Sequence, residues 1–423
     1  MNDWTRRDMM KASAMSVGAV VAPAFASRLS TQGKDTIRVG VIGCGGRGTG
    51  AAWNSLEADP GVRIVAMADL FSDRLKSSHT NLSNEWGERV SVAEEHRFAG
   101  FDAYERLLNL NDIDYVVLAT PPHFRPIHFD AAVEAGKHVF MEKPVAVDPT
   151  GIRRVIEAGR KAKEKGLSVV AGTQRRHEAN YLELMDRIQS GEIGDVVSAS
   201  CAWNQGGLWV HEREPHETDM EWQCRNWLYF CWLSGDHICE QHIHNLDVVN
   251  WAMGAPPIKA VGMGGRQVRT DAKYGNIFDH FAIEYEYAGG RRATSMCRQI
   301  DGCQSRVDER ITGTRGQSIS WPAFAEIKGD KPWKFTSERP NPYMVEHADL
   351  IASIKGDGAH LNEAERVAQS TLTAIMGRMS AYTGKEVTWD MAMGSSLDLA
   401  PESYAFGALQ TDPVPTPGRT PLI

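Results

Sequence analysis

The feature that most constrains the fold is a glycine-rich turn between a buried strand and a helix. Residues 36–42 form a β-branched, apolar run, which is typical of a strand buried on both faces. Gly43-x-Gly45-x-x-Gly48 follows at once, and residues 49–56 have a helical pattern. Gly43 permits a tight turn, Gly45 lets the backbone approach a pyrophosphate, and Gly48 lets the helix lie close to the strand. The stretch predicts a dinucleotide site at a helix N-terminus.

An acidic residue supports this interpretation over a glycine-rich turn without a ligand. Residues 62–68 form a second buried strand pattern, and Asp69 follows it about 20 residues past the last glycine, where a carboxylate can bind a ribose diol. The next residue is Leu70 rather than an arginine, which favours NAD over NADP. The predicted cofactor is therefore NAD, with NADP as the less favoured alternative.

The first 26 residues have the pattern of an export signal. Arg6 and Arg7 precede a mildly apolar run at residues 12–22, and Ala24-Phe25-Ala26 supplies an A-x-A cleavage pattern. The paired arginines resemble a twin-arginine signal, which addresses folded proteins to an exporter. A membrane anchor is the alternative, but the run is shorter than the roughly 20 residues that span a bilayer. We expect a periplasmic or otherwise exported protein.

Charge and cysteine usage exclude several classes of protein. The net charge is −8 and no basic tract is present, so no nucleic-acid partner is expected. The seven cysteines are scattered singly without a C-x-x-C pair, which predicts neither a disulfide framework nor a zinc ribbon. We also expect no membrane span.

Strand and helix patterns alternate up to residue 172. Further strands are expected at 91–92, 115–120, 138–142 and 168–172, and helices at 72–86, 102–109, 125–135 and 149–165. This alternation predicts a Rossmann-type doubly wound parallel sheet, whose ligands bind beyond the carboxyl ends of the strands. The candidate cofactor-binding residues all lie at such ends: Gly43, Gly45, Gly46, Arg47, Gly48, Asp69, Thr120, Pro121, His123, Glu142 and Lys143.

The second half has a different pattern. Strands are expected at 196–202, 258–262, 278–287, 291–298 and 309–313, and helices at 182–189, 345–354 and 363–382. They predict an α+β domain with an open, largely antiparallel sheet. The expected organisation is a signal peptide at 1–26, a Rossmann domain at 35–172, a substrate-binding and oligomerisation domain at 173–410, and an extended tail at 411–423.

An aromatic stretch at residues 203–232 suggests a substrate surface. Flat aromatic rings flanked by polar groups suit a ligand with apolar faces and hydroxyls, such as a sugar ring. A loop packed by its own tryptophans, or buried between subunits, is the alternative. The candidate substrate-contacting residues are Arg176, Trp203, Tyr229 and His242.

The segment from His237 to Met253 carries the candidate acid/base group. Its apolar spacing predicts one helix, on which Glu240 and His244 meet at positions i and i+4. A carboxylate beside a histidine can orient the ring, which makes a general base for a hydroxyl proton. A metal site at His237, Glu240, His242 and His244 is the alternative, but no H-E-x-x-H spacing is present and no metal is predicted.

Three motifs resemble the Gfo/Idh/MocA family of NAD(P)-dependent oxidoreductases. They are G-V-I-G-C-G-G-R-G at 40–48, A-T-P-P-H at 119–123 and M-E-K-P at 141–144. The resemblance implies that Lys143 reaches the nicotinamide and the reacting hydroxyl, and that its peptide bond to Pro144 is cis. It also places Glu240 and His244 where the family's D-x-G-x-H has its Asp–His pair. The chain departs from that motif because Glu240 is longer than Asp and His242 replaces glycine.

The resemblance implies an oxidoreductase that transfers hydride from a CH–OH group of a sugar or sugar derivative. Because an exported enzyme should have no nicotinamide pool to recycle against, we expect the cofactor to stay tightly bound. Lys143, Glu240 and His244 are the predicted catalytic residues. Two alternatives stay open: an NAD-dependent glycosidase that oxidises, eliminates, hydrates and reduces, and a non-catalytic NAD-binding sensor or scaffold. A homo-oligomer, dimer or tetramer, is expected.

Overall fold

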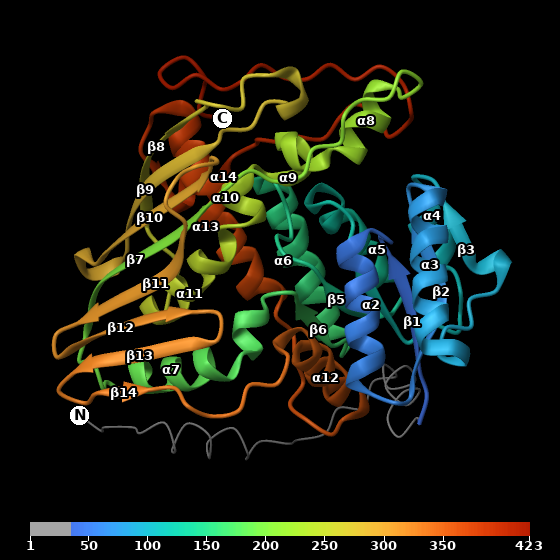
Figure 1. Cartoon of the computed structure of the whole chain (residues 1–423), viewed down its shortest axis with the longest axis horizontal. Coiled ribbons are helices and arrows are strands. Elements are labelled where there is room, and N and C mark those ends of the chain that lie inside the picture. The colour runs from blue at the N-terminus through green and yellow to red at the C-terminus, as the bar shows by residue number, and fades with distance from the viewer. Residues whose placement is uncertain (1–34) are drawn as a thin grey trace.

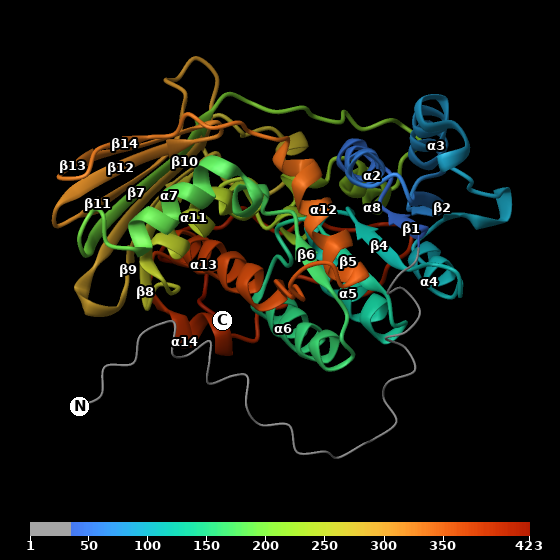
Figure 2. The same ribbon diagram turned by 90° about the horizontal axis from the view of Figure 1, so that it is seen from below.

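The computed structural model describes residues 35–423, and the predicted signal peptide lies outside this range. Figures 1 and 2 show two sheets side by side, a parallel sheet built mainly from the N-terminal third and a larger sheet at the other end of the molecule. Helices α6, α12 and α13 lie between or beneath them. Within the described residues, no helix is both long enough and apolar enough to cross a membrane.

The first sheet confirms the predicted doubly wound fold. In the described part of the chain it has six parallel strands in the order β3-β2-β1-β4-β5-β6. The strands are β1 (Ile37–Ile42), β2 (Val62–Asp69), β3 (Arg97–Ala99), β4 (Tyr115–Leu118), β5 (His138–Met141) and β6 (Val169–Ala171). The order reverses between β1 and β4, which is where such sheets bind ligands.

Helices cover both faces of this sheet because its strands are apolar on both sides. Helices α2 (Gly46–Ala58), α3 (Ser72–Trp86) and α12 (Pro342–Lys355) contribute to the core on one face. Helices α4 (Ala103–Leu108), α5 (Arg125–Glu134), α6 (Pro149–Glu164) and α13 (Ala364–Thr383) contribute to the other. The helix α12 therefore reaches back from the C-terminal third to cover a sheet built by the N-terminal third.

The predicted strand at residues 91–92 is wrong. The third strand on this side is β3 (Arg97–Ala99), which pairs with the end of β2. Residues 94–96 form a 3-10 turn just before it. Val90 forms one isolated parallel bridge with Ile64 of β2, and the backbone N–H of Ser91 donates to the carbonyl of Ile64 at 3.0 Å, so the segment meets the sheet at one point without continuing as a strand.

The second sheet confirms the open, largely antiparallel architecture. In the described residues it has nine strands in the order β14-β13-β12-β11-β7-β10-β9-β8-β15, and one pair, β10 with β7, is parallel. The strands are β7 (Val196–Gln205), β8 (Lys259–Gly265), β9 (His280–Glu286), β10 (Arg292–Gln299), β11 (Arg306–Gly313), β12 (Gly316–Trp321), β13 (Phe324–Gly329), β14 (Trp333–Lys334) and β15 (Val387–Thr388). Strands β12 to β15 were not predicted.

The remaining helices cover one face of this sheet or connect it to the first. They are α7 (Ala179–Gln189), α8 (Asp219–Arg225), α9 (Cys231–Ser234), α10 (His237–Glu240), α11 (Ile243–Met253) and α14 (Trp389–Gly394). The aromatic stretch at 203–232 is thus not one irregular loop, because β7 runs to Gln205 and two short helices follow.

The predicted continuous helix from His237 to Met253 is also wrong, because it breaks between α10 and α11. The backbone N–H groups of both Gln241 and His242 donate to the carbonyl of His237, at 3.0 and 3.1 Å. This turn therefore contains one more residue than a regular α-helical turn. As a result, Glu240 and His244, at positions i and i+4, no longer lie on one helix face. Glu240 ends one helix and His244 begins the next.

The C-terminal residues lie on the second half of this chain. The backbone N–H of Gly418 donates to the carbonyl of Thr383 at 2.9 Å, and the Ser395 hydroxyl donates to the carbonyl of Ile423. The predicted extended tail therefore contacts the end of α13 and the segment after α14.

Candidate functional site

The glycine turn has the shape that a pyrophosphate needs. Gly43 has a φ of 96°, and a Cβ there would lie 2.6 Å from the backbone of Ala119. A Cβ on Gly48 would lie 1.7 Å from the carbonyl oxygen of Gly43, so the helix approaches the turn as closely as predicted. By contrast, a Cβ on Gly45 or Gly46 would meet no atom within 4 Å. Open space thus lies at the N-terminus of α2, where free N–H groups favour an anion.

Asp69 closes this turn at the end of β2. Its carboxylate accepts hydrogen bonds from the backbone N–H of Cys44 at 2.6 Å and of Phe71 at 2.8 Å. Burial raises its pKa, and the two N–H donors oppose that shift. Asp69 therefore fixes the position of the glycine turn while lining the cavity beside it.

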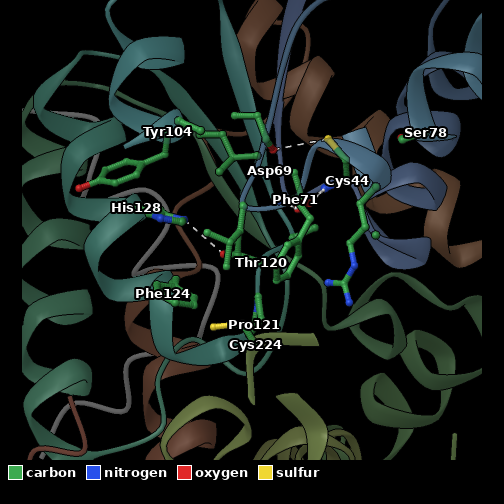
Figure 3. A pocket seen from close by; sticks show the side chains of 18 of the residues that line it. Cys44, Asp69, Phe71, Ser78, Tyr104, Thr120, Pro121, Phe124, His128 and Cys224 are labelled. Carbon is green, nitrogen blue, oxygen red and sulfur yellow. Dashed lines mark hydrogen bonds between the residues drawn. The ribbon is translucent and has the colours of Figure 1, made fainter. Parts of the chain in front are cut away.

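A cavity of about 1030 Å³ extends from the glycine turn across the carboxyl ends of β2, β3 and β4. Figure 3 shows Asp69, Phe71, Tyr104, Thr120 and His128 around it. Its lining includes the predicted residues Gly43, Gly45, Gly46, Arg47, Asp69, Thr120 and Pro121, and also Phe71, Arg74, Phe101, Tyr104, Phe124, His128, Trp209, Trp227 and Tyr404. The cavity thus joins the residues that follow β1, β2 and β4, as the sequence predicts, with those that follow β3, which were not predicted; the predicted residues His123, Glu142 and Lys143 do not line it.

Two buried histidines make hydrogen bonds at this edge of the sheet. His123 contacts the hydroxyl of Tyr404 through Nε2 at 2.8 Å, and burial lowers its pKa to about 4. His128 contacts the Thr120 hydroxyl through Nδ1 at 3.2 Å, and burial lowers its pKa to about 3. Both rings are neutral at pH 7 and act here as hydrogen-bonding apolar surfaces.

Arg47 and Glu142, both predicted to contact the cofactor, contact each other. Arg47 Nε donates to Glu142 Oε1 at 2.5 Å, and Arg47 Nη2 lies 3.5 Å from Glu346 Oε1. Glu346 is fully buried, and neither of its oxygens has a hydrogen-bond partner among residues 35–423. Burial, reinforced by the nearby Glu142, raises the pKa of Glu346 well above its usual value. Glu346 therefore takes up a proton more readily than an exposed glutamate, and the carboxylate that accepts a hydrogen bond from Arg47 is that of Glu142.

Lys143 and Glu240 form an ion pair between the two halves of the chain. Lys143 Nζ donates to the backbone carbonyl of Glu240 at 2.5 Å and lies 3.2 Å from Glu240 Oε1. The peptide bond between Lys143 and Pro144 is cis, as the resemblance implies. The pair lies past the carboxyl end of β5, beyond the part of the cavity described above.

His244 lies at the start of α11 with its ring stacked on Trp203, with ring centroids 5.8 Å apart. Its Nδ1 is buried without a hydrogen-bond partner among the described residues. Burial, and then the positive charges of Lys143, Arg175 and Arg47, hold the pKa of His244 well below its usual value. The imidazole is therefore neutral at pH 7 and available to accept a proton.

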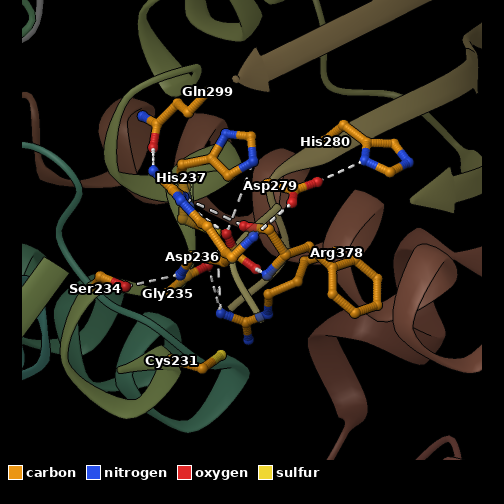
Figure 4. A network of polar contacts seen from close by, with 12 residues as sticks. Cys231, Ser234, Gly235, Asp236, His237, Asp279, His280, Gln299 and Arg378 are labelled. Atoms are coloured by element: carbon orange, nitrogen blue, oxygen red, sulfur yellow. Dashed lines mark hydrogen bonds and ion pairs between the residues drawn. The ribbon is translucent and has the colours of Figure 1, made fainter. Parts of the chain in front are cut away.

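A buried network around Asp236 fixes the segment that carries Glu240 (Figure 4). Asp236, at a φ of 67°, accepts hydrogen bonds from the backbone N–H groups of His237 and Phe278 and from the hydroxyl of Tyr382. Arg378 donates to the carbonyls of Gly235 and Val147 at 2.8 and 2.7 Å. One arginine of α13 thus links the segment before Glu240 to the segment after Lys143.

Three predicted substrate residues are engaged elsewhere and do not line the cavity. Arg176 makes two hydrogen bonds to the carboxylate of Asp247. The hydroxyl of buried Tyr229 donates to the carbonyls of Leu208 and Trp209.

His242 is the third predicted substrate residue that does not line the cavity. It is fully buried, and its Nε2 contacts the hydroxyl of Ser295 on β10 at 2.7 Å and the sulfur of Cys201 on β7 at 3.6 Å. The side chain that replaces the family's glycine therefore points into the second sheet. Of the four predicted substrate residues, Trp203 is the one that contacts a predicted catalytic residue.

Sequence reasoning missed the aromatic wall of the cavity. Phe71 comes two positions after Asp69, so its place just past a strand end could have predicted that it lines the site. Tyr404 had no such signal, because it lies in an irregular segment far along the chain. In the part of the chain that is described, no group of three or more His, Cys, Asp or Glu residues is placed to hold a metal ion.

The fold and the site define a two-part protein with a dinucleotide-binding Rossmann half, whose reactive edge meets acid/base groups from the other half. Comparisons with known proteins agree. The model described as "Oxidoreductase family, NAD-binding Rossmann fold" matches residues 37–171, and the GFO/IDH/MocA C-terminal domain matches residues 181–319. The chain belongs to the Gfo/Idh/MocA family of oxidoreductases, which confirms the resemblance seen in the sequence.

Individual relatives are distant. The uncharacterized oxidoreductase YrbE of Bacillus subtilis is 24% identical over 372 residues, which cover 82% of this chain and 98% of that protein. An inositol 2-dehydrogenase/D-chiro-inositol 3-dehydrogenase of Shouchella clausii is 29% identical over 221 residues, 52% of this chain and 53% of that enzyme. The structure of an aldose-aldose oxidoreductase from Caulobacter crescentus has a TM-score of 0.66 at 18% identity, covering 84% of this chain and 99% of that one. This last likeness shows the fold.

Proposed function

We propose that the protein is an NAD-dependent oxidoreductase that oxidises a hydroxyl group of a sugar or sugar derivative and keeps its cofactor bound. The observation that carries the proposal is the ion pair of Lys143 with Glu240 beside the neutral His244, at the carboxyl edge of a Rossmann sheet. This edge is where such a sheet presents the nicotinamide end of a dinucleotide.

The residues present fit the cofactor. The open space in front of Gly45 and Gly46 accepts a pyrophosphate, and the N-terminus of α2 favours its charge. Asp69 lies where a carboxylate binds the adenosine ribose. Its negative charge would repel a 2′-phosphate, which is the argument for NAD over NADP. Bound there, the dinucleotide supplies a two-electron acceptor for the hydrogen on the substrate carbon.

The chain supplies the proton chemistry. An ammonium has three donors, and Glu240 takes two of those of Lys143, so the third is available to a substrate oxygen. His244 is neutral and can take the hydroxyl proton as the carbonyl forms. Glu240 holds Lys143 in place, and Trp203 holds the ring plane of His244.

The substrate class rests on two supports. Relatives are named as inositol dehydrogenases, and a structural neighbour as an aldose-aldose oxidoreductase. In addition, the indole of Trp203 lies beside His244, and a flat aromatic surface suits the apolar face of a sugar ring.

Export explains why the cofactor should stay bound. The twin-arginine pattern of Arg6 and Arg7 predicts passage across the membrane in the folded state. Outside the cytosol no nicotinamide pool is expected, so a freely exchanging enzyme would stop after one turnover. We therefore propose a cycle in which a second carbonyl compound reoxidises the bound cofactor. The glycosidase alternative needs further acid/base groups, for which the candidates in the sequence are His242, His237 and Tyr229 beside the aromatic stretch at 203–232. His242 and Tyr229 are engaged in buried contacts with Ser295 and with the carbonyls of Leu208 and Trp209, so we favour plain oxidation.

We propose in addition that two or more copies associate through the outer face of the second sheet. Met263 of β8 is 74% exposed there, opposite Ala282 on β9, and Ala282 is in turn opposite Met296 on β10. This apolar row runs across three strands. A second copy would cover it, because an exposed apolar patch of this kind is typical of an association surface.

One experiment tests the main proposal. The protein is purified without its signal peptide, and its absorbance near the reduced-nicotinamide band is recorded before and after adding candidate sugars and glycosides. The nucleotide is then released by denaturation and identified. We expect NAD in the extract and a rise in absorbance with a suitable sugar. Empty protein, or NADP in the extract, would contradict the cofactor assignment.

A further inference from the structure

The C-terminal segment at residues 397–409, which we call the strap, crosses the molecule from the second half to the cofactor cavity. Figure 1 shows this part of the red C-terminal chain running above the helices towards α8. At one end the backbone N–H of Leu399 donates to Asp148 at 2.9 Å. At the other end the side chain of Gln223 donates to the carbonyl of Leu409 at 2.9 Å, and the N–H of Leu409 donates to Asp219 at 3.1 Å. The strap is thus fixed at both ends.

Between these ends, two aromatic side chains reach the loops of the first sheet. The hydroxyl of Tyr404 contacts His123, and its ring lies 5.7 Å from the ring of Phe124 and 6.2 Å from that of Phe101. The ring of Phe406 stacks on Phe71 with an interplanar angle of 14°. Tyr404 lines the 1030 Å³ cavity directly, and Phe406 lies behind Phe71, which also lines it.

The strap is not a core element of the second half. Residues 397–409 contain no helix or strand. They line a second cavity of about 460 Å³ together with Met220, Phe230 and Trp232, and the backbone N–H of Met220 donates to the carbonyl of Gly407 at 3.1 Å. The segment also lies outside both family matches, which end at residues 171 and 319. Its aromatic contacts are made with the loops that follow the strands of the first sheet.

The strap covers a defined part of the cavity. The glycine turn fixes the pyrophosphate, and Lys143 past β5 marks the nicotinamide side. Asp69 marks the adenosine side at the end of β2. Two of the residues contacted by the strap, Phe71 and Phe101, follow β2 and β3 on this adenosine side, and the other two, His123 and Phe124, follow the neighbouring strand β4.

We propose that the strap forms a wall of the adenine-nucleotide subsite, in which Tyr404 and Phe406 hold the adenosine half and slow release of the dinucleotide. The inference rests on the proposed function, because it takes NAD as the ligand. It assigns the retention of the cofactor to the segment from Leu397 to Leu409. An adenine ring entering this cavity meets Tyr404, Tyr104 and Phe124, which supply stacking and edge contacts to a flat heterocycle.

The test compares the parent protein with Tyr404→Ala and Phe406→Ala. Release of NADH is followed by fluorescence after mixing loaded protein with excess NAD, and ADP binding is measured by calorimetry. We expect Tyr404→Ala to speed release and weaken ADP binding by about tenfold to a hundredfold, since aromatic contacts of this size are lost. Phe406→Ala, which acts through Phe71, should show about tenfold or less. Binding of nicotinamide mononucleotide should not change.

Two controls keep the result interpretable. Tyr404→Phe retains the ring and removes the contact with His123, so its release rate should stay within about threefold of the parent. Val414→Ala alters an exposed tail residue outside the strap and should behave as the parent. If the parent binds NADH but Tyr404→Ala and Phe406→Ala release it at the parental rate, this inference is overturned and the proposed function is not. A parent that binds neither NADH nor ADP would overturn the proposed function and this inference together.

Discussion

Lys143 donates one hydrogen bond to the backbone carbonyl of Glu240 and lies within ion-pair distance of the carboxylate of the same residue, although 97 positions separate them. The contact joins the loop after β5 to the end of α10. It is the point at which the dinucleotide-binding half and the acid/base groups of the other half meet. The chemistry proposed for the protein therefore depends on the relative position of the two halves.

Replacing Lys143 should abolish oxidation without emptying the cofactor site. Lys143→Met removes the donor to the substrate oxygen, and the loss of one positioned acid/base group typically costs about 10² to 10⁴ in rate. The glycine turn and Asp69, which hold the other end of the dinucleotide, are untouched. Single-turnover reduction of bound NAD and the nucleotide content of the purified variant are the two measurements. A rate within a few-fold of the parent would show that Lys143 is not a catalytic residue.

The acid side of the pH–rate profile should reflect His244. Its pKa is held below the usual value of 6.5, so the neutral base persists as the pH falls through 7 and 6. We expect kcat/KM for the sugar to stay level over this interval and to fall only at lower pH, where the ring takes up a proton. His244→Ala should lose about 10² to 10⁴ in rate while keeping NAD. An acid limb centred at 6.5 or above in the parent would contradict the assignment.

Stability should fall as the pH rises, because of His177. Burial lowers the pKa of this histidine, but its bonds to Asp349 and Glu363 outweigh burial and raise the pKa to about 9. The folded state thus holds a proton that the unfolded state loses near pH 6.5. The stabilisation is complete below pH 6.5 and is lost as the pH rises to 9, by at most about 3 kcal/mol.

Urea denaturation at pH 6 and pH 9 measures this difference. The parent should lose more stability over the interval than His177→Gln, in which no titrating ring is present. His360→Gln, at an exposed position, serves as the matched control and should follow the parent. Equal losses in the parent and in His177→Gln would assign the effect to other groups.

The oligomer proposal makes a prediction at Met263. A Met263→Glu and Met296→Glu double variant places two charges in the apolar row on the outer face of the second sheet. We expect it to lower the mass in solution towards that of one chain, since burying unpaired charges is unfavourable. Light scattering after gel filtration gives the mass, and Asp112→Asn, an exposed change on the first half, is the control. A parent that is already monomeric would refute the proposal.

The first sheet was predictable because its signals are local. The strand β1, the glycine turn and the helix α2 lie within the 22 residues from Ile37 to Ala58, and β2, β3 and β4 end next to residues that line the cavity. The predicted helix at 72–86 coincides with α3 because its apolar spacing and the glycine that ends it lie in one continuous stretch. Such patterns depend on neighbouring positions and not on the rest of the fold.

The acid/base segment shows why the remainder was harder. The spacing of Glu240 and His244 is correct for a helix, but one extra residue in the turn at Gln241 and His242 changes the faces that follow. That residue is accommodated because His242 finds a partner, Ser295, on a strand more than 50 positions away. A sequence pattern does not contain this partner. The contact of Tyr404 with His123, 281 positions apart, is hidden for the same reason.

The return of α12 to the first sheet determines the order in which this protein can fold. Leu350, Ile351 and Ile354 complete the core that begins with Ile37 and Val39. During synthesis one face of the nucleotide-binding sheet therefore stays partly uncovered until some 355 residues have been made. Fragments that stop before Pro342 should aggregate instead of binding nucleotide, and the cofactor site should become complete only late in the synthesis of the chain.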